Sequence, residues 1–497
     1  MHMPRTPIAV LAVAAMAALG AADKTSLTIY STAEPGAVPA ELYRPVPGSS
    51  ARGYGGAERI PGYAVVKQER TLGIEPGVSE HSFTGVAALL DPTTVLFESL
   101  SDPGGTSVLE QSYRFDLLSM SKMLERYIDK EIIIAGERVT LLSVSGGGLL
   151  VKDGGGAIRY KSGYEGVSFP EIADGLITTP TLVWMIESDT GGEQDTRLSY
   201  ETKGLTWWAD YNMVFHPGAD ANAGTIDLGA WVSILNQSGG SYEDASLKLI
   251  AGDVNRAESS RPDRREYQRM AAATARDKGF EEKSFFEYHL YTLGRPTTIP
   301  DRSTKQLELF ETARGVPVEK ILVYDATGRY MSGGGRHESP TYGLGSPDDV
   351  RVLLRFDNDG GDGLGIPLPA GRVRVSQTDE ADGSLEFIGE DTIDHTPRNE
   401  TVTITMGNAF DVVGERRQVS FQRGRDWMTE TIEVKVRNQK EVPVEVRIRE
   451  HLYRWTNADI TDISHEPDML DARTMMVPVT IGPEGEAVVT YTVRYSW

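Results

Sequence analysis

Cysteine is absent from the chain. Disulfide bonds, thiolate zinc sites and cysteine nucleophiles are therefore excluded together. Histidine is scarce as well, with 8 in 497 residues, and one of these, His2, lies at the very start. A metal site built from several histidines is therefore disfavoured.

Common catalytic motifs are also missing. The sequence has no Gly-x-Ser-x-Gly elbow, no His-Glu-x-x-His pair and no Gly-x-Gly-x-x-Gly after a predicted strand. The three glycines at 146–148 are followed by neither a Gly-Lys pair nor a helix. They indicate a hairpin turn rather than a phosphate-binding loop. We predict no cofactor.

Positive charge is in short supply. Lys and Arg number 50 against 72 Asp and Glu, which gives a formal net charge of -22 and a pI near 4.9. Nucleic acids and anionic membrane surfaces are held mainly by cationic side chains. The composition therefore argues against both as partners.

The first 22 residues resemble a secretory signal. Arg5 precedes an apolar run at 8–19, and small residues end at Ala22. This run is too short to span a bilayer comfortably, so we predict cleavage near Ala22 and no membrane span. The mature protein is then expected in the periplasm or outside the cell.

What remains is dominated by short runs of β-forming residues separated by Gly, Pro and Asp turns. We predict a mainly β protein, with a small SH3-like β-barrel unit, antiparallel β-sandwich domains and one helical insertion. The predicted parts are a signal peptide (1–22), a β segment (23–105), a helix plus the small barrel (106–180), a β-rich domain with a helical insertion at about 258–280 (181–355), and a β-sandwich (356–497).

Some predicted elements are specific enough to test. A strand is expected at 86–90, and a helix at 117–127, where Met120, Leu124 and Tyr127 recur at helical spacing. Separate strands are expected at 401–406 and 418–421. At 431–436, Ile432, Val434 and Val436 alternate with charged residues, which is typical of a half-buried strand.

The stretch KGLTWWADYNMVF (203–215) is the strongest predicted strand. Alternation puts Leu205, Trp207 and Tyr211 on one face, and Trp208 on the other with polar residues. We predict that Trp207 is in the core. Trp208 is left to face a second layer or a partner, which makes it a candidate binding residue.

The same stretch carries a family resemblance. KGLTWWADY, together with segments at 281–310, 363–375, 389–416 and 491–497, resembles the bacterial mucoidy-inhibitor-A-like domain of unknown function. The resemblance covers roughly 181–497 and is to a secreted form without the coiled coil of classical members. No reaction is agreed for that family, so the resemblance implies none.

Two groups of polar residues are candidate sites. In FFEYHLYTL, alternation places Glu287, His289 and Tyr291 on one face of a strand, where a carboxylate could orient an imidazole. We favour a structural polar strip there. The acidic loop DNDGGDG carries the candidate calcium ligands Asp357, Asp359 and Asp362. Because Asp362 stands where an EF-hand needs Gly, and Leu368 where it needs Glu, we favour a surface hairpin.

The favoured function is therefore a non-catalytic binding or scaffold module of the cell envelope. Its partner could be an envelope protein, a peptide strand, a glycan or a second copy, and the oligomeric state stays open. The alternatives are a hydrolase acting on envelope polymers through paired carboxylates, and a calcium-dependent adhesion module.

Overall fold

The computed structural model describes residues 24–31, 38–39, 43, 57–116, 118–173, 175–251, 280–285, 288–327, 335–345, 347–362, 364–379 and 381–497. Across these residues the fold is mainly β and most strand pairs are antiparallel, as predicted. The predicted signal peptide lies outside the described residues. So does the predicted helical insertion, except for Phe280, which begins a strand.

Two sheets form one side of the central body. The larger has the order β16-β17-β15-β1-β2-β12-β4, with β18 paired to β15, and the smaller has the order β3-β11-β5. Their strands are β1 (Lys24–Tyr30), β2 (Tyr63–Ile74), β3 (Gly77–Thr84), β4 (Leu96–Ser99), β5 (Thr106–Arg114), β11 (Thr181–Ser188), β12 (Gly192–Thr202), β15 (Tyr242–Ala251), β16 (Phe280–Phe285), β17 (Tyr288–Leu293) and β18 (Thr297–Ile299). The strand predicted at 86–90 is wrong. Those residues form a turn in which Val86 and Ala87 are nonetheless buried, so their apolar character reflects packing rather than a strand.

The largest sheet has thirteen strands and continues to the C-terminus. Its main path is β22-β21-β13-β14-β19-β20-β23-β24-β29-β26, with β25, β27 and β28 beside it. These strands are β13 (Leu205–Pro217), β14 (Ala223–Asn236), β19 (Ser303–Asp325), β20 (Asp349–Asp357), β21 (Gly371–Thr378), β22 (Leu385–Ile393), β23 (Thr401–Arg423), β24 (Trp427–Asn438), β25 (Val444–His451), β26 (Ala458–Ile463), β27 (Asp468–Asp471), β28 (Thr474–Ile481) and β29 (Glu486–Ser496).

Two large hydrophobic cores are joined by long strands. Strand β23 has 23 residues, and it contributes Val402 and Ile404 to the first core and Val412 to the second. The strands predicted separately at 401–406 and 418–421 are thus one continuous strand. In β24, Ile432, Val434 and Val436 are buried between exposed or half-buried neighbours, as the alternation predicts.

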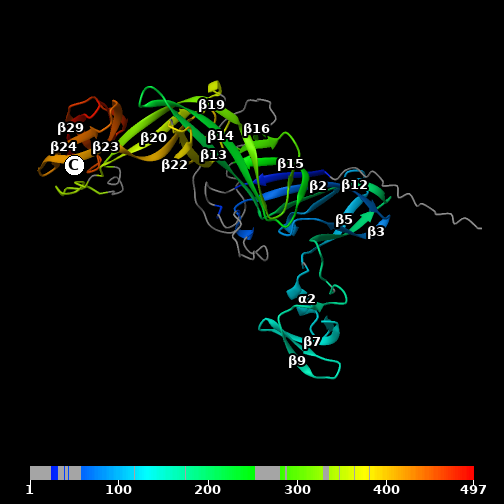
Figure 1. Cartoon of the computed structure of the whole chain (residues 1–497). Coiled ribbons are helices and arrows are strands. Elements are labelled where there is room, and N and C mark those ends of the chain that lie inside the picture. Colours follow the sequence, from blue (N-terminus) through cyan, green and yellow to red (C-terminus); the bar gives the residue numbers. More distant parts are fainter. Residues whose placement is uncertain are drawn as a thin grey trace, which may run out of the picture.

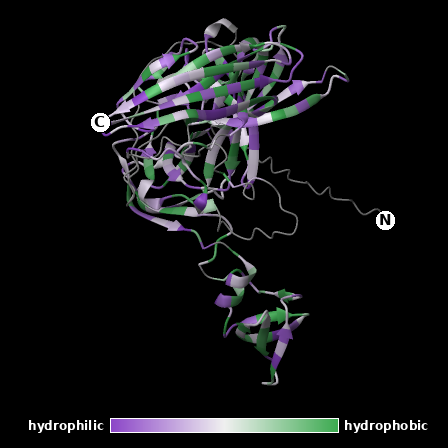
Figure 2. Ribbon diagram, turned by 90° about the vertical axis from the view of Figure 1, so that its left-hand side faces the viewer, coloured by the Kyte–Doolittle hydropathy of each residue, from purple (hydrophilic) through white to green (hydrophobic). Residues whose placement is uncertain are grey.

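A small unit projects from the central body (Figures 1 and 2). It consists of helix α2 (Met120–Arg126) and a five-stranded sheet of order β10-β6-β7-β8-β9, whose strands are β6 (Glu131–Ile134), β7 (Glu137–Ser145), β8 (Gly148–Lys152), β9 (Ile158–Ser162) and β10 (Val167–Ser168). The unit has its own core, centred on Leu124, Ile132 and Leu141. Closure of this sheet into an SH3-like barrel stays a prediction, as do the domain boundaries. Within the described residues, no helix has the length and apolar character needed to cross a membrane.

Candidate functional site

The two adjacent tryptophans of β13 point to different layers. Trp207 is 2% exposed and lies in the first core, with its ring 6.3 Å from that of Tyr291. Trp208 is half-buried; its Nε1 donates to Asp210 Oδ2 at 2.7 Å, and its ring packs 5.3 Å from Tyr43. Trp208 therefore contacts a small second layer, one of the two environments expected for it. A binding role for Trp208 stays a prediction.

His289 is paired with a carboxylate other than the one the sequence suggested. Its Nδ1 lies 2.8 Å from Oε1 of Glu282, which reaches it from the neighbouring strand β16, whereas Glu287 lies outside the described residues. The side chain of Glu282 is 10% exposed and that of His289 is 35% exposed. Tyr291 is buried, and its hydroxyl donates to the Pro367 carbonyl at 2.9 Å. The pairing orients the imidazole, as a carboxylate was expected to do, but Tyr291 belongs to the core.

The acidic loop after β20 is arranged by hydrogen bonds of its own. Asp357 Oδ1 accepts from Thr401 Oγ1 at 2.7 Å, and Asp359 Oδ1 accepts from the Gly361 amide at 3.0 Å. The side chain of Asp362 lies outside the described residues. Among the side chains that are described, no group of three or more His, Asp or Glu residues is placed to hold a metal ion.

The second core contains two buried ion pairs that sequence reasoning missed. Arg454 Nε donates to Glu430 Oε2 at 2.7 Å, and Arg416 Nε donates to Glu450 Oε2 at 3.0 Å. The remaining guanidinium nitrogens of Arg454 donate to the carbonyls of His337, Ser339 and Tyr342, and Nη1 of Arg416 donates to the carbonyl of Gly343. Burial by itself lowers the pKa of Arg416, but the Glu450 carboxylate together with Tyr491 and Tyr453 raises this pKa well above its usual value. Because each carboxylate is neutralised by an arginine, the pairs suit a structural role and not proton transfer.

Alkaline pH is expected to destabilise this second core. Burial raises the pKa of Tyr453 to about 12, and it also raises the pKa of Tyr491 and Tyr495. Above pH ~10, where tyrosines of the unfolded chain ionise, the unfolded state binds fewer protons than the folded state. The free energy of unfolding should then fall by about 1.4 kcal/mol per pH unit for each such tyrosine.

Urea titrations at increasing pH, followed by tyrosinate absorbance, would check this expectation. Ionisation of the buried tyrosines should coincide with unfolding. Exposed tyrosines such as Tyr160 ionise while the protein is folded, so a partial early rise in absorbance is expected. Tyrosinate absorbance that reaches its full value before the protein unfolds would contradict the expectation.

His451 lies between a hydroxyl and a carboxylate, an arrangement that invites a catalytic interpretation. Its Nδ1 is 3.1 Å from Thr474 Oγ1, and its Nε2 is 3.6 Å from Asp325 Oδ2. The second distance exceeds a hydrogen bond. Asp325 also accepts from Arg351 at 3.3 Å, and Thr474 is buried. The group is thus an ionic cluster around Asp325 without an accessible nucleophile.

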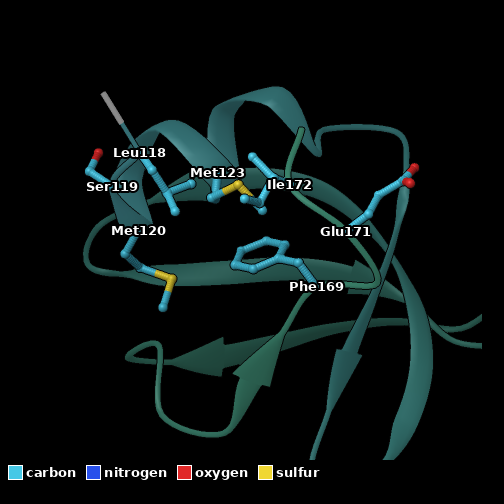
Figure 3. Close-up of a pocket in the computed structure, with 7 residues that line it drawn as sticks. All are labelled: Leu118, Ser119, Met120, Met123, Phe169, Glu171 and Ile172. Carbon is cyan, nitrogen blue, oxygen red and sulfur yellow. The ribbon is translucent and has the colours of Figure 1, made fainter. Parts of the chain in front are cut away.

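An open site within the described part of the chain is an apolar groove beside α2 in the projecting unit (Figure 3). Its volume is about 540 Å³, and it is lined by Leu118, Ser119, Met120, Met123, Phe169, Glu171 and Ile172. Figure 3 shows the ring of Phe169 below Met123 and Ile172, with Met120 and Glu171 at opposite ends. Leu118, Met120 and Ile172 are all exposed. The groove thus offers a concave apolar surface with polar groups confined to its rim.

Local contacts hold the walls of this groove in place. Ser119 caps the start of α2, since its Oγ accepts from the Lys122 amide at 3.3 Å. Tyr127 packs 4.9 Å from the ring of Phe169, and its hydroxyl donates to the Glu171 carbonyl at 2.8 Å. The segment 169–172 is thereby fixed against the helix.

Met120, in one wall of the groove, is more exposed than its helical spacing suggests. Helical spacing groups Met120 with Leu124 and Tyr127 on a buried face, but only Leu124 and Tyr127 are buried. Met120 is exposed because α2 begins at that residue, and the small sheet covers only the following turn. An apolar residue left out of the core in this way marks a candidate contact for a partner.

Comparisons of the chain with known proteins do not assign this site to a known family. No protein-family model matches the chain, and no curated protein matches it either.

Proposed function

We propose that the protein is a non-catalytic binding module that holds an apolar segment of a partner protein in the groove beside α2. The groove carries this proposal, because it places the exposed side chains of Leu118, Met120 and Ile172 around Phe169. Flexible methionines beside an aromatic ring suit a surface that adapts to an apolar partner. Such concave apolar sites are the usual places for docking a hydrophobic anchor.

The projecting position supports the same function. The unit stands away from the two large cores and carries its own core (Figures 1 and 2). A partner can therefore approach the groove without displacing the central sheets.

We further propose that this module acts in the cell envelope after export, as a secreted relative of the mucoidy-inhibitor-A-like domain. Support comes from the signal-like pattern of residues 1–22 and from the five segments that carry the resemblance. Several of those segments occupy structural positions. Trp207 and Tyr211 are core residues, and the Tyr211 hydroxyl donates to the Pro369 carbonyl at 2.7 Å.

The groove can be tested with charge substitutions on its rim. Ile172→Glu and Met120→Glu are expected to weaken partner binding by about tenfold or more, because a lost apolar anchor of this size contributes roughly 1.5–3 kcal/mol. Both side chains are exposed, so the fold should be retained. Leu109→Glu, at an exposed apolar position on β5, is the matched control.

A photoreactive amino acid placed at Met120 identifies the partner in the native host, and the affinity of the purified partner is then measured by calorimetry. Cross-linking from position 120 but not from 109 is the expected result. Equal affinities of the groove variants and the control would refute the proposal.

A further inference from the structure

Strand β9 forms an open edge of the projecting unit. It ends the sheet order β10-β6-β7-β8-β9, and its described pairing partner is β8 alone. An edge strand leaves a row of main-chain N–H and C=O groups that a further strand can pair with. Natural proteins usually make such edges unattractive, so the side chains of β9 decide whether this edge invites or repels a partner.

The outer face of this edge is apolar. Leu150 of β8 lies directly opposite Tyr160 of β9, and Ile158 follows two residues away on the same face. Leu150 is 38% exposed, Tyr160 is 59% exposed and Ile158 is 66% exposed. These side chains lie on the face away from the unit's core, because the alternate residues Leu149 and Val151 are buried in it. The groove beside α2 is built from other residues.

Gly148 of β8 leaves room for Tyr160 on the outer face of this edge. A Cβ added at Gly148 would lie 2.5 Å from the Tyr160 hydroxyl and 2.6 Å from its Cζ. The hydroxyl end of Tyr160 therefore lies against Gly148, where a larger residue would collide with it. Tyr160 thus extends the apolar face of β9 onto β8.

The inner face of the same edge carries two basic residues, Arg159 and Lys161, which alternate with the apolar residues. Arg159 is already neutralised, because its Nη2 lies 2.5 Å from Asp153 Oδ2 and its Nη1 lies 3.7 Å from Glu137 Oε2. Lys161 donates to the main-chain carbonyl of Glu165, which carries no charge. β9 could in principle pair with β9 of a second copy so that the apolar residues of the two strands faced each other. Arg159 and Lys161 of one copy would then face the same two basic residues of the other copy. Like charges directly opposite one another on paired strands are destabilising. The basic residues thus disfavour self-association, and the charge of Lys161 favours an acidic residue opposite it on a partner strand.

We infer that β9 binds an extended segment of a partner protein in which apolar and acidic side chains alternate. The segment adds a strand to the sheet through main-chain hydrogen bonds. Its apolar side chains pack beside Ile158 and Tyr160, and one of its carboxylates faces Lys161. This surface is independent of the groove, so one can fail while the other holds.

The experiment selects short random peptides displayed on phage against the full chain, and then measures their affinities by fluorescence anisotropy. We expect enrichment of peptides with alternating apolar and acidic residues. Ile158→Glu and Lys161→Glu should each weaken peptide binding about fivefold, since a cross-strand pair contributes up to about 1 kcal/mol. Replacing the facing acidic residue of the peptide by lysine should restore binding to the Lys161→Glu variant.

The control Lys67→Glu changes net charge equally at an exposed position on β2 and should leave affinity unchanged. The inference is overturned if no such peptides are enriched, or if those selected bind both β9 variants as tightly as the unaltered chain. It is also overturned if their binding is lost in Ile172→Glu, which would place them in the groove. A concentration-dependent dimer that Ile158→Glu abolishes would assign the edge to a second copy instead.

Discussion

Replacing Trp207 by alanine is expected to lower the free energy of unfolding by about 3–5 kcal/mol, the range for large aromatic truncations in a core. Trp207 is almost fully buried in the first core and packs against Tyr291. Its neighbours on the same face of β13, Leu205 and Tyr211, are buried as well.

Trp208→Ala is the matched comparison on the adjacent residue. Trp208 is half-buried, so its loss removes less apolar contact and one hydrogen bond to Asp210, which contributes about 1 kcal/mol. Urea denaturation of both variants, followed by circular dichroism, measures the difference. If Trp208→Ala proved the more destabilising of the two, the assignment of the core face of β13 would be wrong.

Arg454→Met is expected to cost a similar amount, about 3–5 kcal/mol, because it leaves a buried carboxylate without its cation. Both side chains of the Arg454–Glu430 pair have 0% exposure. The substitution also removes the donors to the carbonyls of His337, Ser339 and Tyr342. The segment around 337–342 should therefore loosen, which hydrogen exchange would detect as lost amide protection.

A double variant separates the ion pair from the segment it holds. Arg454→Met combined with Glu430→Leu removes both charges, so much of the stability lost in the single variant should return. Protection of the segment around 337–342 should stay low, because its carbonyls still lack their donors. If the double variant were less stable than Arg454→Met alone, uncompensated charge would not be the cause of the loss.

The two proposed surfaces assign different chemistry to one small unit. The groove takes an apolar anchor, and the edge of β9 takes an extended acidic and apolar segment. A single partner could use both, since the residues of the two surfaces differ. Binding measurements with Ile172→Glu, Ile158→Glu and the double variant would show whether their effects add.

The candidate sites show which contacts could be predicted from the sequence and which could not. Alternation correctly predicted that Trp207 is buried, and it offered Glu287 as the carboxylate that could orient His289. It could not identify Glu282 as the partner of His289, because their pairing depends on the register of β16 against β17. The buried arginines had no local signal at all, since their partners Glu430 and Glu450 come from other strands.

The sequence by itself determined the mainly β fold, the alternation within strands such as β24 and the burial of Trp207. These properties follow from the period of side chains along one strand, which needs no knowledge of the neighbouring strand. Tertiary structure alone decided that 401–406 and 418–421 are one strand joining two cores, that Met120 lines a groove, and that β9 is an open edge. Each of these three features depends on which distant segments pack together. The spacing of side chains along a single strand or helix does not specify its neighbours.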